Sequence, residues 1–193
     1  MSQLIALDLG GVIVDVDHDR CARKLGLKWS ACEDAFFAGG LHDRLTIGAI
    51  DANVFIETAA TALGKDPALV RDAWADVVDV MPEGRALVDE LLASGCRVHL
   101  WSNTDPIHLA RMLDGLPPGV VADTASFQLG AMKPQPAFFQ RALARGVPAI
   151  FLDDRLDVVD AARAEGVHAT RCIGPTQARA LLVEAWLLRR AHL

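Results

Sequence analysis

The stretch Ile5-Ala6-Leu7-Asp8-Leu9-Gly10-Gly11-Val12-Ile13-Val14-Asp15 decides the fold that this sequence predicts. Its apolar beginning, Leu4–Leu7, is typical of a buried strand, and a carboxylate and two glycines follow directly. Burial on one side raises the pKa of such a carboxylate unless a cation keeps it ionised. The glycines let the backbone turn tightly and approach a ligand closely. Taken alone, an Asp that ends a strand and caps a turn is the commoner interpretation.

Short apolar runs elsewhere predict the remaining strands, at residues 98–101, 149–152 and 167–169, with a weaker one near 120–122. Helical patterns lie between these runs, at residues 82–94, 105–113, 136–145, 156–166 and 176–190. Strands that alternate with helices predict an α/β fold, with a parallel sheet sandwiched by helices. Ligands of such folds bind at the carboxyl ends of the strands.

Residues 17–80 interrupt this alternation and predict helices only, at 18–25, 29–38, 48–63 and 66–80. The segment comes directly after the first strand and its turn. We therefore expect a small all-helical cap at 17–80, inserted into a core domain made of residues 1–16 and 81–193. The alternative is that these helices only pad the core.

Three further polar groups follow predicted strands or loops of the core. Ser102-Asn103-Thr104 offers a hydroxyl and backbone N–H groups to an anion, although Ser and Asn also favour plain turns. Lys133, in Gly130-Ala131-Met132-Lys133-Pro134, is a compact cation, although most lysines are merely solvated. Asp153-Asp154 places two acids side by side, and a divalent cation would relieve their repulsion. N-capping of the next helix would need only one of them.

Together these groups, in this order, resemble the haloacid-dehalogenase-like (HAD) hydrolase superfamily over nearly the whole chain. The resemblance implies a HAD-like Rossmannoid sheet with an inserted helical cap. Within the superfamily, residues 8–15, 102–104, 133–134 and 153–154 look most like the branch that includes glucose-1-phosphate phosphatase. The Asp-Asp pair is also similar to that of the N-terminal phosphatase domain of soluble epoxide hydrolase.

The resemblance implies a role for each matching residue. Asp8 would be the nucleophile that forms an aspartyl-phosphate. Mg²⁺ would be held by Asp8, Asp154 and the carbonyl of Gly10. Ser102 and the Asn103 amide would bind the phosphoryl group, and Lys133 would pair with it and with Asp8. Asp153 would stabilise these ligands without binding the metal or the substrate itself. Two cap residues, His42 and Arg44, are candidates for substrate contact, although a solvated loop explains them as well.

Two positions depart from the family pattern. Gly10 stands where most superfamily phosphatases carry a second Asp, the general acid, whose loss typically costs ~10²–10⁴-fold in rate. Asp15, Asp17, His18 and His42 are the candidates to replace it. Val158 stands where Asp or Asn is common, and Asp157 would compensate or face solvent.

Three interpretations therefore remain open at this point. The first is a magnesium-dependent phosphatase of small phosphorylated metabolites such as sugar phosphates. The second is a 2-haloacid dehalogenase, because halide needs no proton, although the Asp153-Asp154 pair is unlike that group. The third is a catalytically weak binding or regulatory protein.

Composition limits the partners that we expect for these 193 residues. With 19 Lys and Arg against 25 Asp and Glu the net charge is −6, and no basic cluster predicts nucleic-acid binding. Cys21, Cys32, Cys96 and Cys172 form no CxxC pair, which disfavours zinc and disulfides. No apolar run is long enough for a membrane span, and the start lacks the pattern of a signal peptide. We expect a cytoplasmic monomer or homodimer, and an apolar last helix with Trp186 is one candidate contact.

Overall fold

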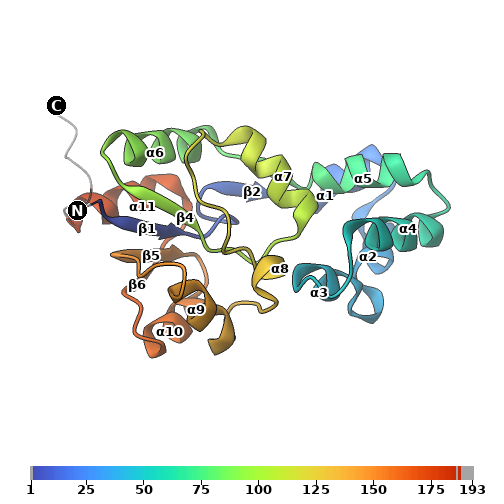
Figure 1. Cartoon of the computed structure of the whole chain (residues 1–193). Helices are drawn as coiled ribbons and strands as arrows, with labels where there is room; N and C mark the ends of the chain where they lie inside the picture. Colours follow the sequence, from blue (N-terminus) through green and yellow to red (C-terminus); the bar gives the residue numbers. More distant parts are fainter. Residues whose placement is uncertain (1, 186, 188–193) are drawn as a thin grey trace.

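The structure is a computed structural model that describes residues 2–185 and 187 (Figure 1). Within that range, parallel strands form one sheet in the order β4-β1-β5-β6. The strands are β1 (Leu4–Leu7), β4 (Arg97–Leu100), β5 (Ile150–Asp153) and β6 (Ala169–Arg171). The expected strand near 120–122 is only a bridge between Val121 and His99. Pro117 and Pro118, which lack a backbone N–H, come just before it.

Helices cover both faces of this sheet, as Figure 1 shows. The helices are α6 (Pro82–Ala93), α11 (Gly174–Glu184), α9 (Pro136–Leu143) and α10 (Leu156–Ala164). Side chains of β1 alternate between the two faces, as the pleat of a strand requires. Ile5 and Leu7 pack in the hydrophobic cluster of α6 and α11, whereas Leu4 and Ala6 pack in that of α9 and α10. The predicted α/β sandwich is confirmed.

A helical segment lies beside the carboxyl end of the sheet, between two short antiparallel strands (Figure 1). The strands are β2 (Val14–Val16) and β3 (Val78–Val80). The helices between them are α1 (His18–Lys24), α2 (Trp29–Phe37), the 3₁₀ turn η1 (Ala38–Gly40), α3 (Leu41–Thr46), α4 (Ala52–Leu63) and α5 (Pro67–Ala75). We call residues 17–80 the cap segment. Two further helices complete the core, α7 (Pro106–Gly115) and α8 (Ser126–Leu129).

Some element boundaries differ from those predicted. The helix expected at 66–80 ends at Ala75, because the β-branched valines that follow pair with β2. The helix expected at 48–63 begins at Ala52, where the Asp51 carboxylate accepts from the N–H groups of Asn53 and Val54. Residues 42–44, expected in a loop, lie in α3. The final helix ends at Glu184, and the expected contact of Trp186 lies outside the described residues.

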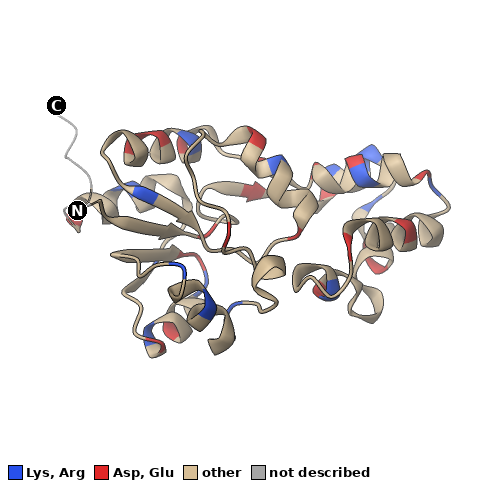
Figure 2. Cartoon of the chain, viewed as in Figure 1, with Lys and Arg blue, Asp and Glu red and all other residues tan. Residues whose placement is uncertain are grey.

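Charged residues are spread over the outer helices. Figure 2 shows Lys and Arg interspersed with Asp and Glu, rather than gathered on one face in this view. Among the residues that the structure describes, no helix is both long and apolar enough to cross a membrane.

Candidate active site

The carboxyl ends of three neighbouring strands bring the predicted polar residues together. Asp8 follows β1, Asp153 ends β5 and Ser102 lies two residues beyond β4. The sheet continues past the strand ends, because the Asp8 N–H donates to the Leu152 carbonyl at 2.8 Å. The hydrogen-bonded backbone therefore fixes the position of Asp8 at the carboxyl end of the sheet, where the sequence predicts that ligands bind.

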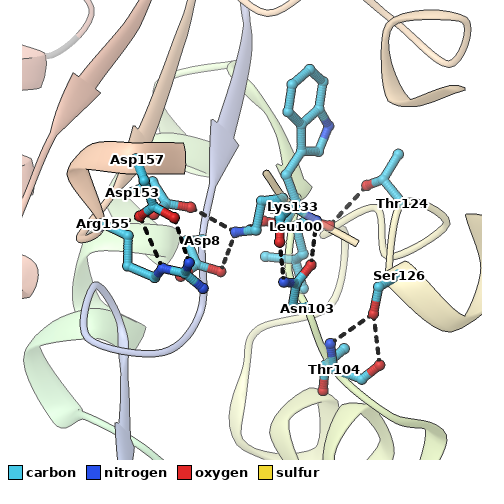
Figure 3. A network of polar contacts seen from close by, with 11 residues as sticks. Asp8, Leu100, Asn103, Thr104, Thr124, Ser126, Lys133, Asp153, Arg155 and Asp157 are labelled. Atoms are coloured by element: carbon cyan, nitrogen blue, oxygen red, sulfur yellow. Dashed lines mark hydrogen bonds and ion pairs between the residues drawn. The ribbon is translucent and has the colours of Figure 1, made fainter. Parts of the chain in front are cut away.

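The ammonium of Lys133 is the centre of this group (Figure 3). Its Nζ lies 2.8 Å from Oδ1 of Asp8 and 2.6 Å from Oδ2 of Asp153. It also donates to the Trp101 carbonyl oxygen at 2.7 Å. An ammonium has three N–H donors, so the protein itself accepts all of them. Lys133 is thereby fixed in orientation, and its charge is directed at the Asp8 carboxylate.

Burial and charge act against each other on these groups. Burial opposes the charged form of Lys133, yet the carboxylates of Asp8 and Asp153 outweigh it and raise the lysine's pKa. Lys133 is therefore a permanent cation at neutral pH. For Asp154, burial and then the charge of Asp153 raise the pKa of the carboxyl. The ammonium thus pairs with two carboxyl groups while a third lies beside them, and an added cation would offset the remaining negative charge.

Asp8, Asp153 and Asp154 form a carboxylate cluster, with one oxygen of each within 4.8 Å of the others. Hard oxygen donors of this kind suit Mg²⁺ or Ca²⁺. The backbone leaves room for Asp154 only because residue 11 is glycine. Gly11 has φ of 70°, and a Cβ there would lie 2.6 Å from Oδ2 of Asp154. The donor set and this close packing fit a divalent cation.

The loop after β4 is anchored by hydrogen bonds on both sides. The side-chain amide of Asn103 donates to the Lys133 carbonyl and accepts from the Lys133 N–H, both at 2.8 Å. The Ser126 hydroxyl accepts from the Thr104 N–H and donates to its carbonyl, both at 3.0 Å. Asn103 therefore holds the lysine loop with its side chain. The Ser102 hydroxyl has no hydrogen bond to any described residue and lines a cavity.

That cavity, of about 220 Å³, lies between the sheet edge and the cap segment. Gly10, Ser102 and Asn103 of the core line it, together with Phe37 and His42 of the cap segment. Its other lining residues are Leu9, Val14, Val16, His18, Trp74, Val77, Val78, Thr104, His108 and Met112. A small molecule in this space would touch the strand ends and the cap segment at once.

Two of the predicted residues lie away from this cavity. Arg44 is exposed on α3 and is not among the lining residues, whereas its neighbour His42 is. Asp157 is exposed and pairs with Arg155, whose guanidinium lies 2.6 Å from its Oδ2. It does not join the carboxylate cluster, and Val158 is buried in the core. Of the two alternatives that the sequence left for Asp157, the structure shows the second, because its carboxylate is exposed to solvent beside the Arg155 guanidinium.

A buried network behind the cavity has no counterpart in the sequence analysis. Asp105 accepts from the Trp74 indole N–H at 3.1 Å, and its carboxylate lies 3.0 Å from Nδ1 of His108. Nε2 of His108 donates to the Trp74 carbonyl at 2.8 Å. Burial raises the pKa of Asp105, but the charge and hydrogen bonds of His108 outweigh it and bring the pKa to about 2. The sequence indicated only that Asp105 would cap α7, which it does.

Asp15 and Asp17 pair with arginines of the cap segment. Asp15 is exposed and pairs with Arg20. Asp17 caps α1 by accepting from the Asp19 N–H at 2.9 Å, and it lies 3.2 Å from Arg23. Neither residue lines the cavity. Of the four candidates for the missing acid, only His18 and His42 do.

Comparison with known proteins shows which proteins this chain resembles over most of its length. No family model matches the chain. A D-ribitol-5-phosphate phosphatase of Bacteroides thetaiotaomicron is 27% identical over 172 residues, which are 80% of this chain and 84% of that protein. A HAD-family enzyme of the same organism, solved with magnesium and inorganic phosphate, has a TM-score of 0.71 at 21% identity, over 89% of this chain and 94% of that one.

A third likeness is to a HAD-like family hydrolase from Porphyromonas gingivalis. It has a TM-score of 0.70 at 25% identity and covers 94% of this chain and 98% of that one. The fold and the site thus define an α/β protein of HAD-like architecture. With these relatives, they support the HAD-like superfamily as the one to which the chain belongs.

Proposed function

We propose that this protein is a magnesium-dependent phosphatase of small phosphate monoesters, with Asp8 as nucleophile and residues 17–80 as its cap. The observation that carries the proposal is the position of the Lys133 ammonium, 2.8 Å from Asp8 and 2.6 Å from Asp153. A lysine in this position offsets the charge of a nearly buried carboxylate and fixes its orientation. Both properties are required of a carboxylate nucleophile.

Asp8 would attack phosphorus with a carboxylate oxygen while the bond to the leaving oxygen breaks. The product is an aspartyl-phosphate, which water then hydrolyses to phosphate and the free carboxylate. Phosphoryl transfer depends mainly on positioning and charge stabilisation, and the bonded backbone beneath Asp8 supports positioning. The chain also supplies donors for the phosphoryl oxygens, in the Ser102 hydroxyl and the Asn103 backbone N–H. Lys133 would reach the phosphoryl group only by sharing a donor that it already uses.

Mg²⁺ would be held by the carboxylates of Asp8 and Asp154 and by the Gly10 carbonyl. When bound it would offset the negative charge of the phosphoryl group and of the carboxylate cluster. Asp153 gives one oxygen to Lys133 and the other to the Arg155 N–H at 3.0 Å. It would therefore orient the lysine rather than bind the metal. The relative solved with magnesium and phosphate supports this cofactor.

The cavity favours an uncharged, hydroxylated leaving group. Among its described lining residues there is no Lys, Arg, Asp or Glu, whereas aromatic rings and histidines are present. Aromatic faces suit the C–H groups of a sugar or polyol, and histidines can bond its hydroxyls. The relative named as a D-ribitol-5-phosphate phosphatase supports the same class. We therefore propose sugar or polyol phosphates as substrates.

Release of phosphate from 4-nitrophenyl phosphate tests the proposal, because this aryl leaving group needs little protonation. We expect turnover with Mg²⁺, none in excess EDTA, and none in Asp8→Asn, which keeps the size of the side chain. Turnover by Asp8→Asn would reject the nucleophile. Chloride release from 2-chloropropionate would instead favour the dehalogenase, and binding of sugar phosphates without turnover would favour a binding protein.

A further inference from the structure

Position 10 leaves the proposed phosphatase without a carboxylic acid to protonate its leaving group. A Cβ on Gly10 would have its nearest contact, Val16 Cγ2, at 3.4 Å, and Val16 lines the cavity. A side chain at position 10 would therefore point into the cavity. A donor to the leaving oxygen has to come from another residue that lines the same space.

Only three described lining residues carry a titratable side chain, namely His18, His42 and His108. His108 has no free ring nitrogen for a leaving group, since its Nδ1 faces Asp105 and its Nε2 donates to the Trp74 carbonyl. His42 has its Nε2 3.4 Å from the Thr46 hydroxyl, one turn along α3. His18 is half-buried, and its imidazole ring has no hydrogen bond to any residue that the structure describes.

The ring of His18 is held in place by aromatic packing rather than by polar contacts. Its centroid lies 4.6 Å from that of Trp29, 5.9 Å from Phe37 and 6.2 Å from Trp74. It is the first residue of α1, whose N-cap is Asp17. The ring is thus oriented while its polar atoms stay free for a ligand.

We infer that His18 is the proton donor to the leaving group, in place of an acid at position 10. The inference rests on the proposed phosphatase function. As Asp8 attacks phosphorus, the bond to the leaving oxygen breaks and its electron pair stays on that oxygen. The oxygen takes a proton from the His18 imidazolium, which becomes neutral. When water attacks the aspartyl-phosphate, the carboxylate of Asp8 is released, and the neutral ring accepts the proton of the water.

The charges around His18 set the pH at which it can donate. Burial lowers its pKa below 6.5, and the charge of His108 on α7 adds to this. Asp17, Glu33 and Asp19 act in the opposite direction. The protonated form of the ring is therefore the minor form at neutral pH, and its fraction increases as the solution becomes mildly acidic. The rate of turnover that depends on this proton therefore increases as the pH falls.

Two substrates separate the proton donor from the rest of the site. Glycerol 2-phosphate leaves as an alkoxide and needs the proton, whereas 4-nitrophenyl phosphate does not. We expect His18→Gln to lower kcat/KM for glycerol 2-phosphate by ~10²-fold and that for 4-nitrophenyl phosphate by only a few fold. Adding Gly10→Asp to His18→Gln should restore most of the loss. His168→Gln, at an exposed histidine bonded to the Ala149 carbonyl, is the matched control and should change neither rate.

Equal losses on both substrates, or no loss on either, would overturn the inference. The wild-type protein gives a second measurement that needs no variant. The ratio of alkyl to aryl turnover should rise from pH 8 to pH 5.5, because changes in Asp8 or in the metal affect both substrates. A ratio that stays flat with pH would also overturn the inference. Absence of aryl phosphatase activity in the wild-type protein would instead reject the proposed function itself.

Discussion

Asp154 and Gly11 are packed so closely that a methyl group on residue 11 would lie 2.6 Å from a carboxylate oxygen of Asp154. Real Cβ atoms do not approach an oxygen so closely, so either the carboxylate or the turn would have to move. Asp154 belongs to the carboxylate cluster that we propose as the metal site. The glycine therefore sets the position of a metal ligand, in addition to making a turn.

Gly11→Ala should consequently weaken Mg²⁺ binding and phosphatase activity together. Its backbone, at φ of 70°, would also cost about 1 kcal/mol of stability in a non-glycine residue. Gly26→Ala is the matched control, because Gly26 has φ of 72° and its Cβ would meet nothing within 4 Å. We expect similar shifts in thermal unfolding for the two variants, but a higher Mg²⁺ requirement only for Gly11→Ala. Equal Mg²⁺ requirements would reject the role of Gly11 in placing Asp154.

Gly10→Asp tests whether the site lacks a proton donor. The added Cβ has one contact, at 3.4 Å, so the variant should fold. If His18 donates the proton, the gain on glycerol 2-phosphate should stay below ~10-fold, well short of the ~10²–10⁴-fold that general acids supply. Gly10→Asn is the control of equal size without an acid, and steady-state rates compare the three proteins. A gain of ~10²-fold or more for Asp alone would show that the wild-type site has no donor.

Much of this site could be predicted from the sequence, because its residues follow apolar strands. Asp8, Asp153 and Ser102 come after runs that are buried on both faces, and a parallel sheet brings such positions to one edge. Lys133 was identified by its place in the order of the motifs, and its loop is tied to Asn103. Asp154 was correctly placed beside the other acids for the same reason.

The parts of the site and fold that the sequence did not predict depend on contacts between residues far apart in the chain. Trp74 and Asp105 are bonded across 31 positions, and neither pattern of apolar residues nor turn chemistry indicates such a pair. The strand β3 was missed because its valines follow a helical pattern without interruption, and only pairing with β2 decides their conformation. Arg44 was a candidate because it lies in the cap segment, and Asp157 because it is next to Val158, but neither reason shows the direction of a side chain.

Removal of the Lys133 charge should destabilise the fold as well as abolish activity. Lys133→Met would leave the buried carboxylate of Asp153 without its cation, and breaking a buried ion pair typically costs about 3–5 kcal/mol. The double variant Lys133→Met with Asp153→Asn removes both charges and should recover a large part of that loss without recovering activity. Urea unfolding and aryl phosphatase assays measure the two effects. A single variant as stable as wild type would contradict the assigned pairing.

Stability at low pH should depend on Asp105. Its pKa of about 2, against 3.8 for an ordinary Asp, means that the folded protein holds the ionised form more strongly than the unfolded chain does. The lowered pKa therefore contributes stability that is fully present above pH 4 and is lost as the pH falls towards 2. At ~1.4 kcal/mol per unit, this amounts to about 2 kcal/mol.

Asp105→Asn keeps an N-cap residue on α7 but loses the charge that faces His108. We expect the variant to be about 2 kcal/mol less stable at pH 6, with the difference shrinking towards pH 2, as measured by urea unfolding across that range. Asp66→Asn, the same change at the exposed N-cap of α5, controls for the loss of one carboxylate. If the two variants lost stability equally at pH 6, the buried Asp105–His108 pair would not be the source of the effect.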